Sequence, residues 1–277
     1  MTKLENIELE VALPKSSNNE EPVRGGKRNI KRIKWTVRLG SLIIFFVAWQ
    51  LYARGQSPLL IVTPTAIASA FGQMAADGTL GSAAVLSLEA LVVGFGSALI
   101  IGIPLGLLWA RYRVVDWVIQ PFVMAIFSTP LIALVPLYVL WFGFGFTAKV
   151  AIIGSFSFFP LLLNTYQGAV SVDPMYRDVA RAFRATDRQT WRHVVIPSCV
   201  PYIAAGVNIS LGHALTGMII AEFYTNASGL GGLVLKNADT FQTAKMFVPV
   251  FLVMVLGIFL MSSTRWLKRK IAPWAER

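Results

Sequence analysis

Charged side chains, and residues that bind metals or form disulfides, are scarce in this sequence. Charged residues make up 14% of the 277 positions, whereas a soluble domain averages about 25%. The chain holds one cysteine, Cys199, which excludes a disulfide scaffold and a multi-cysteine metal site. Its two histidines and the lack of a His-Glu-x-x-His motif count against a metalloenzyme. We therefore expect neither a metal nor a catalytic residue in this chain.

The sequence is instead rich in long apolar runs. Hydrophobic residues make up 55% of the chain, and their runs are long enough to cross about 30 Å of hydrocarbon as helices. Strands of a membrane barrel alternate in short segments, so these continuous runs exclude a barrel. We predict an all-α integral membrane protein with about six transmembrane helices. Their approximate bounds are 36–53, 87–110, 119–142, 148–166, 202–223 and 247–264.

The basic residues are bunched, and their distribution predicts the orientation. The net charge of +11 is confined to short segments between apolar runs, so nucleic acid is not an expected partner. Cytoplasmic segments of inner-membrane proteins carry such an excess of Lys and Arg. With both termini in the cytoplasm, the outer side holds only Arg54, Lys149, Lys236 and Lys245 of the 25 basic residues. We therefore predict a multi-pass protein of the bacterial inner membrane with cytoplasmic termini.

The composition divides the chain into three regions. Residues 1–35 form a polar, basic tail that we expect to be disordered and cytoplasmic. Residues 36–265 form the transmembrane domain, and residues 266–277 form a cytoplasmic C-terminal tail. On the outer side we expect a short surface helix over about 66–76, and a second long segment over 224–246 that contains several glycines.

The cytoplasmic loop over about 167–198 differs from every other loop. Asp173 followed by Pro174 indicates a helix start, because Asp caps free N–H groups and Pro suits the first turn. The apolar residues that then fall on one helical face are Val179, Ala182 and Phe183. The loop should therefore begin with a short amphipathic helix.

A second short helix is expected in the same loop. Thr186 or Asp187 would cap it, it would run through His193, and Pro197 would end it and lead into the next span. The two helices would form a compact helix–turn–helix at the membrane surface. Amphipathic cytoplasmic helices often lie in the interface without a partner, and the helix pattern alone leaves that alternative open.

The residue pattern of this loop resembles the coupling motif of importer-type ABC transporter permeases. That motif reads Glu-Ala-Ala, three residues, Gly, nine residues, Ile, any residue, Leu-Pro. The same register here gives Asp178-Val-Ala180, then Arg184, then Val194-Val-Ile-Pro197. Asp for Glu, Val for Ile and Ile for Leu are mild changes. Arg184 stands where the motif has Gly, and this departure concerns the geometry of the turn after the first helix.

Other segments are similar to the nitrate/sulfonate/taurine permease subfamily. The matching segments are 87–106, 130–145 with Lys149, 221–223 and 229–231. They resemble the second span, the third span, and the end of the fifth span with its following loop. The resemblance covers about residues 57–265 and implies the type I ABC importer permease fold.

The resemblance also implies partners and a non-catalytic role. No phosphate-binding Gly-x-x-x-x-Gly-Lys-Ser/Thr motif is present, so ATP would be bound by separate cytoplasmic ATPase subunits and no cofactor by this chain. An extracytoplasmic solute-binding protein would deliver substrate. A second permease copy, expected as a homodimer, would complete the pathway in the lipid bilayer. The residues expected to couple the loop to the ATPase are Asp178, Val179, Ala180, Ala182, Phe183, Arg184 and Pro197.

Polar residues in the spans are candidates for the translocation pathway, because they are costly in hydrocarbon. They are Glu222, His213, Asn208, Thr216 and Glu89. Glu222 ranks above Glu89 because the subfamily has an acid at that place, and His213 could meet an anion as a cation. His213, Asn208 and Thr216 could instead make interhelical hydrogen bonds, worth about 0.6 kcal/mol on average. Glu222 and Glu89 lie close to an interface, where a charge costs little.

Three function classes remain, and ATP-driven import is favoured. The chain would form the pathway for a small anion such as nitrate, a sulfonate or taurine. A self-contained secondary transporter or channel would prefer ionisable residues near the bilayer midplane, whereas the acids here lie near the interfaces. A membrane enzyme lacks a catalytic constellation. The substrate stays open, because selection in such systems rests largely on the separate binding protein.

Overall fold

The computed structural model describes residues 26–225 and 227–271. It divides into two units, Met1–Ala48 and Trp49–Arg277. The first unit is described from Gly26 onward, as the beginning of α1 (Gly26–Arg54). This helix starts well before the predicted span at position 36, so the end of the expected disordered tail has a helical backbone. The rest of that tail, residues 1–25, lies outside the described residues.

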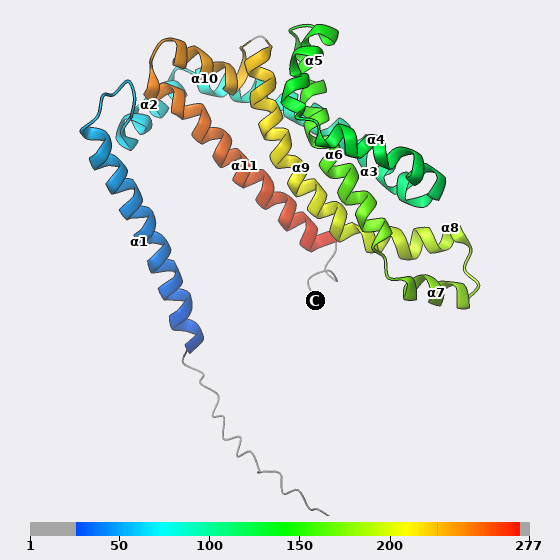
Figure 1. The fold of residues 1–277 in the computed structure, drawn as a ribbon. Coiled ribbons are helices and arrows are strands. Elements are labelled where there is room, and N and C mark those ends of the chain that lie inside the picture. Colours follow the sequence, from blue (N-terminus) through cyan, green and yellow to red (C-terminus); the bar gives the residue numbers. More distant parts are fainter. Residues whose placement is uncertain (1–25, 226, 272–277) are drawn as a thin grey trace, which may run out of the picture. The chain divides into compact units, whose positions relative to one another are not determined.

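The described residues of the second unit form only helical elements. They are α2 (Pro64–Ala76), α3 (Thr79–Arg111), α4 (Arg113–Ser128), a 3₁₀ turn (Leu131–Leu134), α5 (Val135–Phe142), α6 (Phe146–Val170), α7 (Pro174–Ala182), α8 (Asp187–Thr190), a π turn (Trp191–Val195), α9 (Ile196–Tyr224), α10 (Gly229–Asp239) and α11 (Thr243–Ile271). Helix α6 packs between α3 and α9, and α11 packs on α9. Helices α2 and α10 lie at one end of this bundle, and α7 and α8 lie at the other (Figure 1).

Five helices among the described residues are long and apolar enough to cross a membrane. They cover Ile33–Arg54, Thr79–Arg111, Phe146–Val170, Asp187–Tyr224 and Thr243–Lys270. The predicted third span is a bent pair of helical segments, Arg113–Ser128 and Leu131–Phe142, which meet at 87°. The predicted number of six spans therefore holds if this bent pair counts as one.

The bend in the third span follows from its proline. Pro130 disfavours a helical conformation at the preceding residue, and Thr129 accordingly has φ −76° and ψ 133°. Helix α4 ends there, and the chain resumes as a 3₁₀ turn at Leu131. The bend is thus encoded locally, whereas the 87° angle depends on packing.

Close helix packing around α6 depends on glycines of its neighbours. A Cβ added to Gly94 of α3 would lie 2.7 Å from the Cβ of Ile153, and one added to Gly106 would lie 2.7 Å from the Cβ of Thr165. Both distances are too short for real atoms. Small residues at such spacing let helix backbones approach closely in lipid, so α3 and α6 are in near-backbone contact along their length.

A helix forms where the sequence predicts a short surface helix over 66–76, and this helix is α2. Thr63 caps it, since its hydroxyl accepts a hydrogen bond from the amide of Ala66 at 3.3 Å. Asp77 follows the helix, and its carboxylate accepts hydrogen bonds from the hydroxyl and the amide of Thr79 at 2.6 and 2.9 Å. These bonds hold the pKa of Asp77 below its usual range and connect α2 to the start of α3.

Candidate functional site

The first helix of the loop over 167–198 forms where the sequence predicts it. Asp173 accepts a hydrogen bond from the amide of Met175 at 2.9 Å, and α7 begins at Pro174. Arg177 of α7 donates to the backbone carbonyl of Ala169, at the C-terminal end of α6, at 2.9 Å. A guanidinium is favourable at that negative end of a helix dipole. Arg177 therefore fixes α7 to the core of the bundle.

The predicted contact residues of α7 differ sharply in exposure. Ala180 is buried against the bundle, whereas Val179 is 46% and Phe183 is 83% exposed. Asp178 and Ala182 are also exposed, and Asp178 pairs with Arg181 at 3.1 Å on the helix surface. The side chain of Phe183 is thus almost fully exposed. It lies at the C-terminal end of α7, the end that faces away from the bundle.

The turn after α7 shows how Arg184 can stand where the coupling motif has glycine. This residue has φ 55°, the left-handed conformation that glycine adopts most readily. Its amide donates to the carbonyl of Arg181 at 2.8 Å, and the amide of Ala185 donates to that of Ala180 at 2.9 Å. This pair of bonds is the Schellman motif that ends many helices. Arg184 therefore makes the turn that a glycine would make, at a cost of about 1 kcal/mol.

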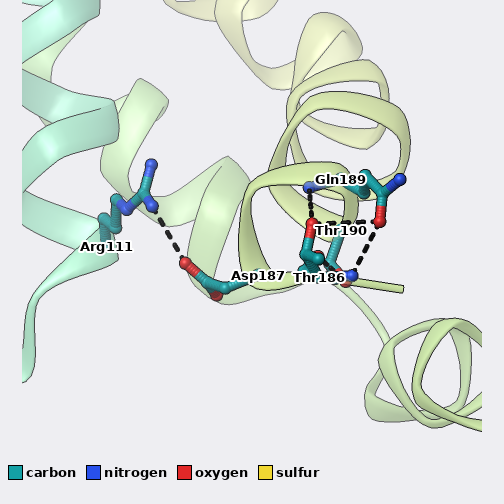
Figure 2. A network of polar contacts seen from close by, with 5 residues as sticks. All are labelled: Arg111, Thr186, Asp187, Gln189 and Thr190. Carbon is teal, nitrogen blue, oxygen red and sulfur yellow. Dashed lines mark hydrogen bonds and ion pairs between the residues drawn. The ribbon is translucent and has the colours of Figure 1, made fainter. Parts of the chain in front are cut away.

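Thr186 begins the second helix and closes a capping box with Gln189. Its hydroxyl accepts from the amide of Gln189 at 3.3 Å, and the side chain of Gln189 accepts from the amide of Thr186 at 2.8 Å (Figure 2). Beside this cap, Asp187 pairs with Arg111 at 2.9 Å (Figure 2). The Arg111 guanidinium also lies 5.5 Å from the ring centre of Trp191. Arg111, the last residue of α3, therefore connects that helix to the start of α8.

The expectation that Pro197 ends the second helix is wrong. The helical backbone continues from Asp187 through the π turn into α9, as far as Tyr224. Proline lacks an N–H group and its ring clashes with the preceding turn. The π turn widens that region, and the amide of Ile196 bonds to the carbonyl of Trp191, five residues back. A π turn absorbs such a misfit without ending a helix.

A buried carboxylate lies near the C-terminal end of α9, where α10 begins. Glu222 is fully buried. One oxygen accepts from the hydroxyl of Ser87 at 2.6 Å, and the other accepts from the amide of Gly231 at 2.7 Å. Ser87 in turn accepts from the amide of Leu230 at 2.8 Å. Glu222 and Ser87 thus bind the first amides of α10, where a helix favours negative charge.

The glycines of α10 are required by this arrangement. Gly229 has φ 83°, and a Cβ added there would overlap the Oε1 atom of Glu222 and lie 2.6 Å from the hydroxyl of Ser87. Lys149 is 6% exposed, and its ammonium donates to the hydroxyl of Ser228 at 2.6 Å. Residues from α3, α6 and α9 therefore meet at the start of α10, a helix that is not predicted over 224–246.

The five pathway candidates do not share one surface. His213 and Thr216 are exposed on α9, on the face that also exposes Ile209 and Phe223. Asn208 is turned toward α11, where it accepts a hydrogen bond from the hydroxyl of Thr264 at 3.0 Å. Glu89 is exposed on α3. Glu222 contacts only the packed junction described above. The open face of α9 therefore brings together two of the five, His213 and Thr216.

Comparison with known proteins gives the family. Residues 102–273 match the model of the binding-protein-dependent transport system inner membrane component. The putative aliphatic sulfonates transport permease protein SsuC of Bacillus subtilis (strain 168) is 29% identical over 95% of this chain and 95% of its own length. The riboflavin transport system permease protein RibX of Chloroflexus aurantiacus is 30% identical over 89% of this chain and 94% of its own.

A solved structure shows the same fold. The inward-facing MetNI methionine ABC transporter matches with a TM-score of 0.56 and 18% identity, over 67% of this chain and 93% of the matched chain. This likeness confirms the predicted type I importer permease fold. The alternative of a self-contained secondary transporter or channel is set aside by the family match. The chain belongs to the family of inner membrane components of binding-protein-dependent transport systems, as a permease subunit of an ABC importer of the nitrate/sulfonate/taurine type.

Proposed function

We propose that this chain forms half of the translocation pathway of an importer for a small organic anion of the sulfonate class. A separate cytoplasmic ATPase binds and hydrolyses ATP, and an extracytoplasmic solute-binding protein delivers the anion. The observation that carries this proposal is the exposed end of α7, with Phe183 at its tip. It offers an apolar contact on a helix that is itself fixed to the bundle.

The coupling contact is a short helix presented for insertion into a groove. Phe183 would be the buried anchor, Val179 would lie beside it, and Asp178 and Arg184 would lie at the rim. Because Arg177 bonds to the end of α6, a displacement of α7 is passed directly to α6. Pro197 would act through the π turn, which joins the loop to α9. This arrangement supports transmission from the ATPase to two helices of the bundle.

The distribution of basic residues supports a cytoplasmic location for this loop. Arg177, Arg181, Arg184, Arg188 and Arg192 belong to this loop, whereas Lys149, Lys236 and Lys245 lie in α6, α10 and α11 near the opposite end of the bundle. Cytoplasmic segments carry the excess of basic residues. With the loop on the cytoplasmic side, both termini would be cytoplasmic, and the end of the bundle where α2 and α10 lie (Figure 1) would face outward.

The pathway lies on the open face of α9, between two copies of this chain. His213 and Thr216 are exposed there, although the remainder of the helix packs on α6 and α11. Polar side chains that face away from the bundle in a membrane span line a water-filled cavity or a protein contact. A homodimer with both α9 faces turned inward would place two imidazoles beside the passing solute. This supports an anionic substrate, since an imidazole N–H group can donate a hydrogen bond to an anion.

The sulfonate class is favoured by similarity along the whole chain. SsuC, whose name specifies aliphatic sulfonates, aligns with 95% of this sequence. The relative named for riboflavin transport aligns almost as widely, so the scaffold serves more than one solute. Selection among anions then rests with the binding protein.

The test is ATP-driven uptake by the reconstituted complex. Phe183→Asp should abolish co-purification of the ATPase and uptake of a radiolabelled alkanesulfonate into proteoliposomes, because it places a charge in the contact. A hot-spot side chain contributes about 2 kcal/mol or more to such a contact, or roughly 30-fold in affinity. Phe183→Leu should retain the complex. Normal ATPase binding and uptake by Phe183→Asp would refute the coupling assignment.

A further inference from the structure

Helices α9 and α11 enclose an apolar pocket at the end of α11 that lies toward α7 and α8 (Figure 1). The pocket has a volume of 210 Å³. Four apolar residues line it from one face of α9, between Val200 and Val207, and Leu267 lines it from α11. Thr264 and Lys268 of α11 are its polar lining residues. An apolar cavity of about 150 Å³ stays dry and takes up apolar molecules, so we expect an apolar group in this pocket.

The two walls of the pocket are fixed to each other beside it. The hydroxyl of Thr264 donates a hydrogen bond to the side-chain oxygen of Asn208 at 3.0 Å. Further along the pair, a Cβ added to Gly257 of α11 would lie 3.1 Å from the Cδ1 atom of Leu215, so α9 and α11 are in close contact there. The pocket is therefore a fixed gap at one end of a packed helix pair. Leu267 is 49% exposed, so the pocket opens on the surface of a membrane span.

Basic residues cluster at the same end of α11. They are Arg265, Lys268, Arg269 and Lys270, and α11 contains no acidic residue. Lys268 is half-buried at the pocket, whereas the other three are exposed. Within residues 26–225 and 227–271, no acid forms an ion pair with Lys268. A positive charge thus lies at the mouth of an apolar pocket, without a negative partner in the described part of the chain.

Trp266 indicates the depth of this pocket in the membrane. Trp is enriched at the boundary between hydrocarbon and headgroups, and the ammonium of Lys270 lies 4.0 Å from the ring centre of Trp266. Lys side chains near helix ends extend their charge to the same boundary. Lys268 therefore lies at headgroup depth. From Val200 to Val207 the pocket extends about 10 Å along α9, toward the depth of the acyl chains.

We propose that this pocket binds one anionic phospholipid, with its phosphate on Lys268 and an acyl chain between α9 and α11. Charge complementarity selects this occupant, because basic pockets between spans bind acidic lipid headgroups. A soluble phosphate would leave the apolar part of the pocket empty, and an uncharged apolar molecule would leave Lys268 without a counter-ion. The inference goes beyond the proposed function and takes from it only the orientation, which places this lipid in the cytoplasmic leaflet.

The bound lipid would act on the helix that joins the bundle to the loop over 167–198. Helix α9 continues from that loop through the π turn, and the lipid would hold α9 against α11 where the pocket separates them. A ligand that binds only the folded protein stabilises it by mass action. Anionic phospholipid should therefore raise the melting temperature of the permease.

Native mass spectrometry of the full-length permease in detergent tests the charged half of the site. Phosphatidylglycerol and phosphatidylcholine with the same acyl chains are titrated separately, and phosphatidylglycerol should bind more tightly. Lys268→Gln should weaken phosphatidylglycerol binding by about 5-fold, the contribution of one basic residue near an anionic lipid surface, and Lys268→Arg should retain it. The matched control is Lys270→Gln, which removes an exposed charge from the same helix end and should have a smaller effect.

A second pair of variants tests the apolar half. Ala204→Leu fills the pocket from α9 while Lys268 stays in place. It should weaken phosphatidylglycerol binding by about 4-fold for each methylene group that it displaces. Ala205→Leu is the matched control, because residue 205 is exposed beside the pocket and does not line it. The control should bind as the wild type does.

The outcomes separate a lipid site from general attraction to a basic surface. Wild-type affinity in either Lys268→Gln or Ala204→Leu would overturn the proposal, as would an equal loss in the matched control of either variant. Equal affinity for the two phospholipids would also overturn it. Glycerol phosphate has no acyl chain, so binding of glycerol phosphate as tight as that of phosphatidylglycerol would equally refute the site. None of these results depends on the transported solute or on the ATPase.

Discussion

The two ends of α9 differ in their polar contacts, which are buried at one end and exposed at the other. At the C-terminal end, which is the outer end in the proposed orientation, the fully buried carboxylate of Glu222 joins α9 to α3 and to the start of α10 through short hydrogen bonds. At the inner end, the helix continues through a π turn into a loop whose ion pair, Arg111 with Asp187, is 33% and 74% exposed. Exposed ion pairs contribute about 0–1 kcal/mol, whereas each buried polar group left without its hydrogen-bond partner costs about 1–3 kcal/mol.

This difference indicates where the molecule is rigid and where it moves. A contact worth less than about 1 kcal/mol breaks and reforms readily at room temperature, which suits the proposed role of this loop in coupling to an ATPase. The outer junction instead maintains the position of α10 relative to α3, α6 and α9. Stability is concentrated at the outer end, and conformational freedom at the inner end.

The largest effect is expected from breaking the outer junction. Glu222→Ala leaves the hydroxyl of Ser87 and the amide of Gly231 without their acceptor, and removes the carboxylate near the buried ammonium of Lys149. We expect a loss of about 2–6 kcal/mol in the free energy of unfolding, or about 1–3 kcal/mol for each of the two buried donors left without an acceptor, seen as low abundance and a lower melting temperature in detergent. The matched control is Glu89→Ala, an exposed acid of α3. Equal stability of the two variants would contradict a structural role for Glu222.

A smaller effect, of opposite sign, is expected at the inner turn. Arg184→Gly places the preferred residue at φ 55° and should raise the free energy of unfolding by about 1 kcal/mol. Thermal melting of the purified permease measures it. Arg188→Gly, which removes a nearby Arg from a helical position in α8, is the control and should lower the melting temperature. A fall in stability for Arg184→Gly would show that the guanidinium makes a contact outweighing the backbone strain.

The smallest effect is expected from the exposed ion pair at the same end. A double-mutant cycle of Arg111→Ala and Asp187→Ala should give a coupling energy of about 0–1 kcal/mol, and it should fall as salt rises. Chemical denaturation at low and high ionic strength measures both. A salt-independent coupling above 2 kcal/mol would place the inner end in the same class as the outer junction and remove the contrast.

The comparison also shows what sequence can predict. The long apolar runs predict the spans, and Asp173 with Pro174 predicts the start of α7, because both signals are local. Pro130 likewise predicts the break in the third span. Local rules failed at Pro197, where a π turn lets the helix continue, and they could not show that Arg184 would adopt the conformation of glycine.

The outer junction cannot be predicted from the pattern of neighbouring residues in the sequence. Ser87 and Leu230 lie 143 positions apart, and the glycine-rich segment that begins α10 has the composition of a loop. The helix forms because a distant carboxylate and hydroxyl satisfy its first amides. Residues 221–231 resemble a known subfamily, and this resemblance is the only sequence signal that singles out both Glu222 and Gly229. It does not predict that the two residues are in contact.

Hydrogen–deuterium exchange of the permease in nanodiscs, alone and with its ATPase, tests the central claim most directly. The account predicts that amides of residues 174–195 become protected when the ATPase binds, and change again on ATP addition. Amides of residues 229–232, held by Glu222 and Ser87, should stay protected in every state. Exchange that changes at residues 229–232 and not in the loop would contradict the assignment of rigidity to the outer end and coupling to the inner end.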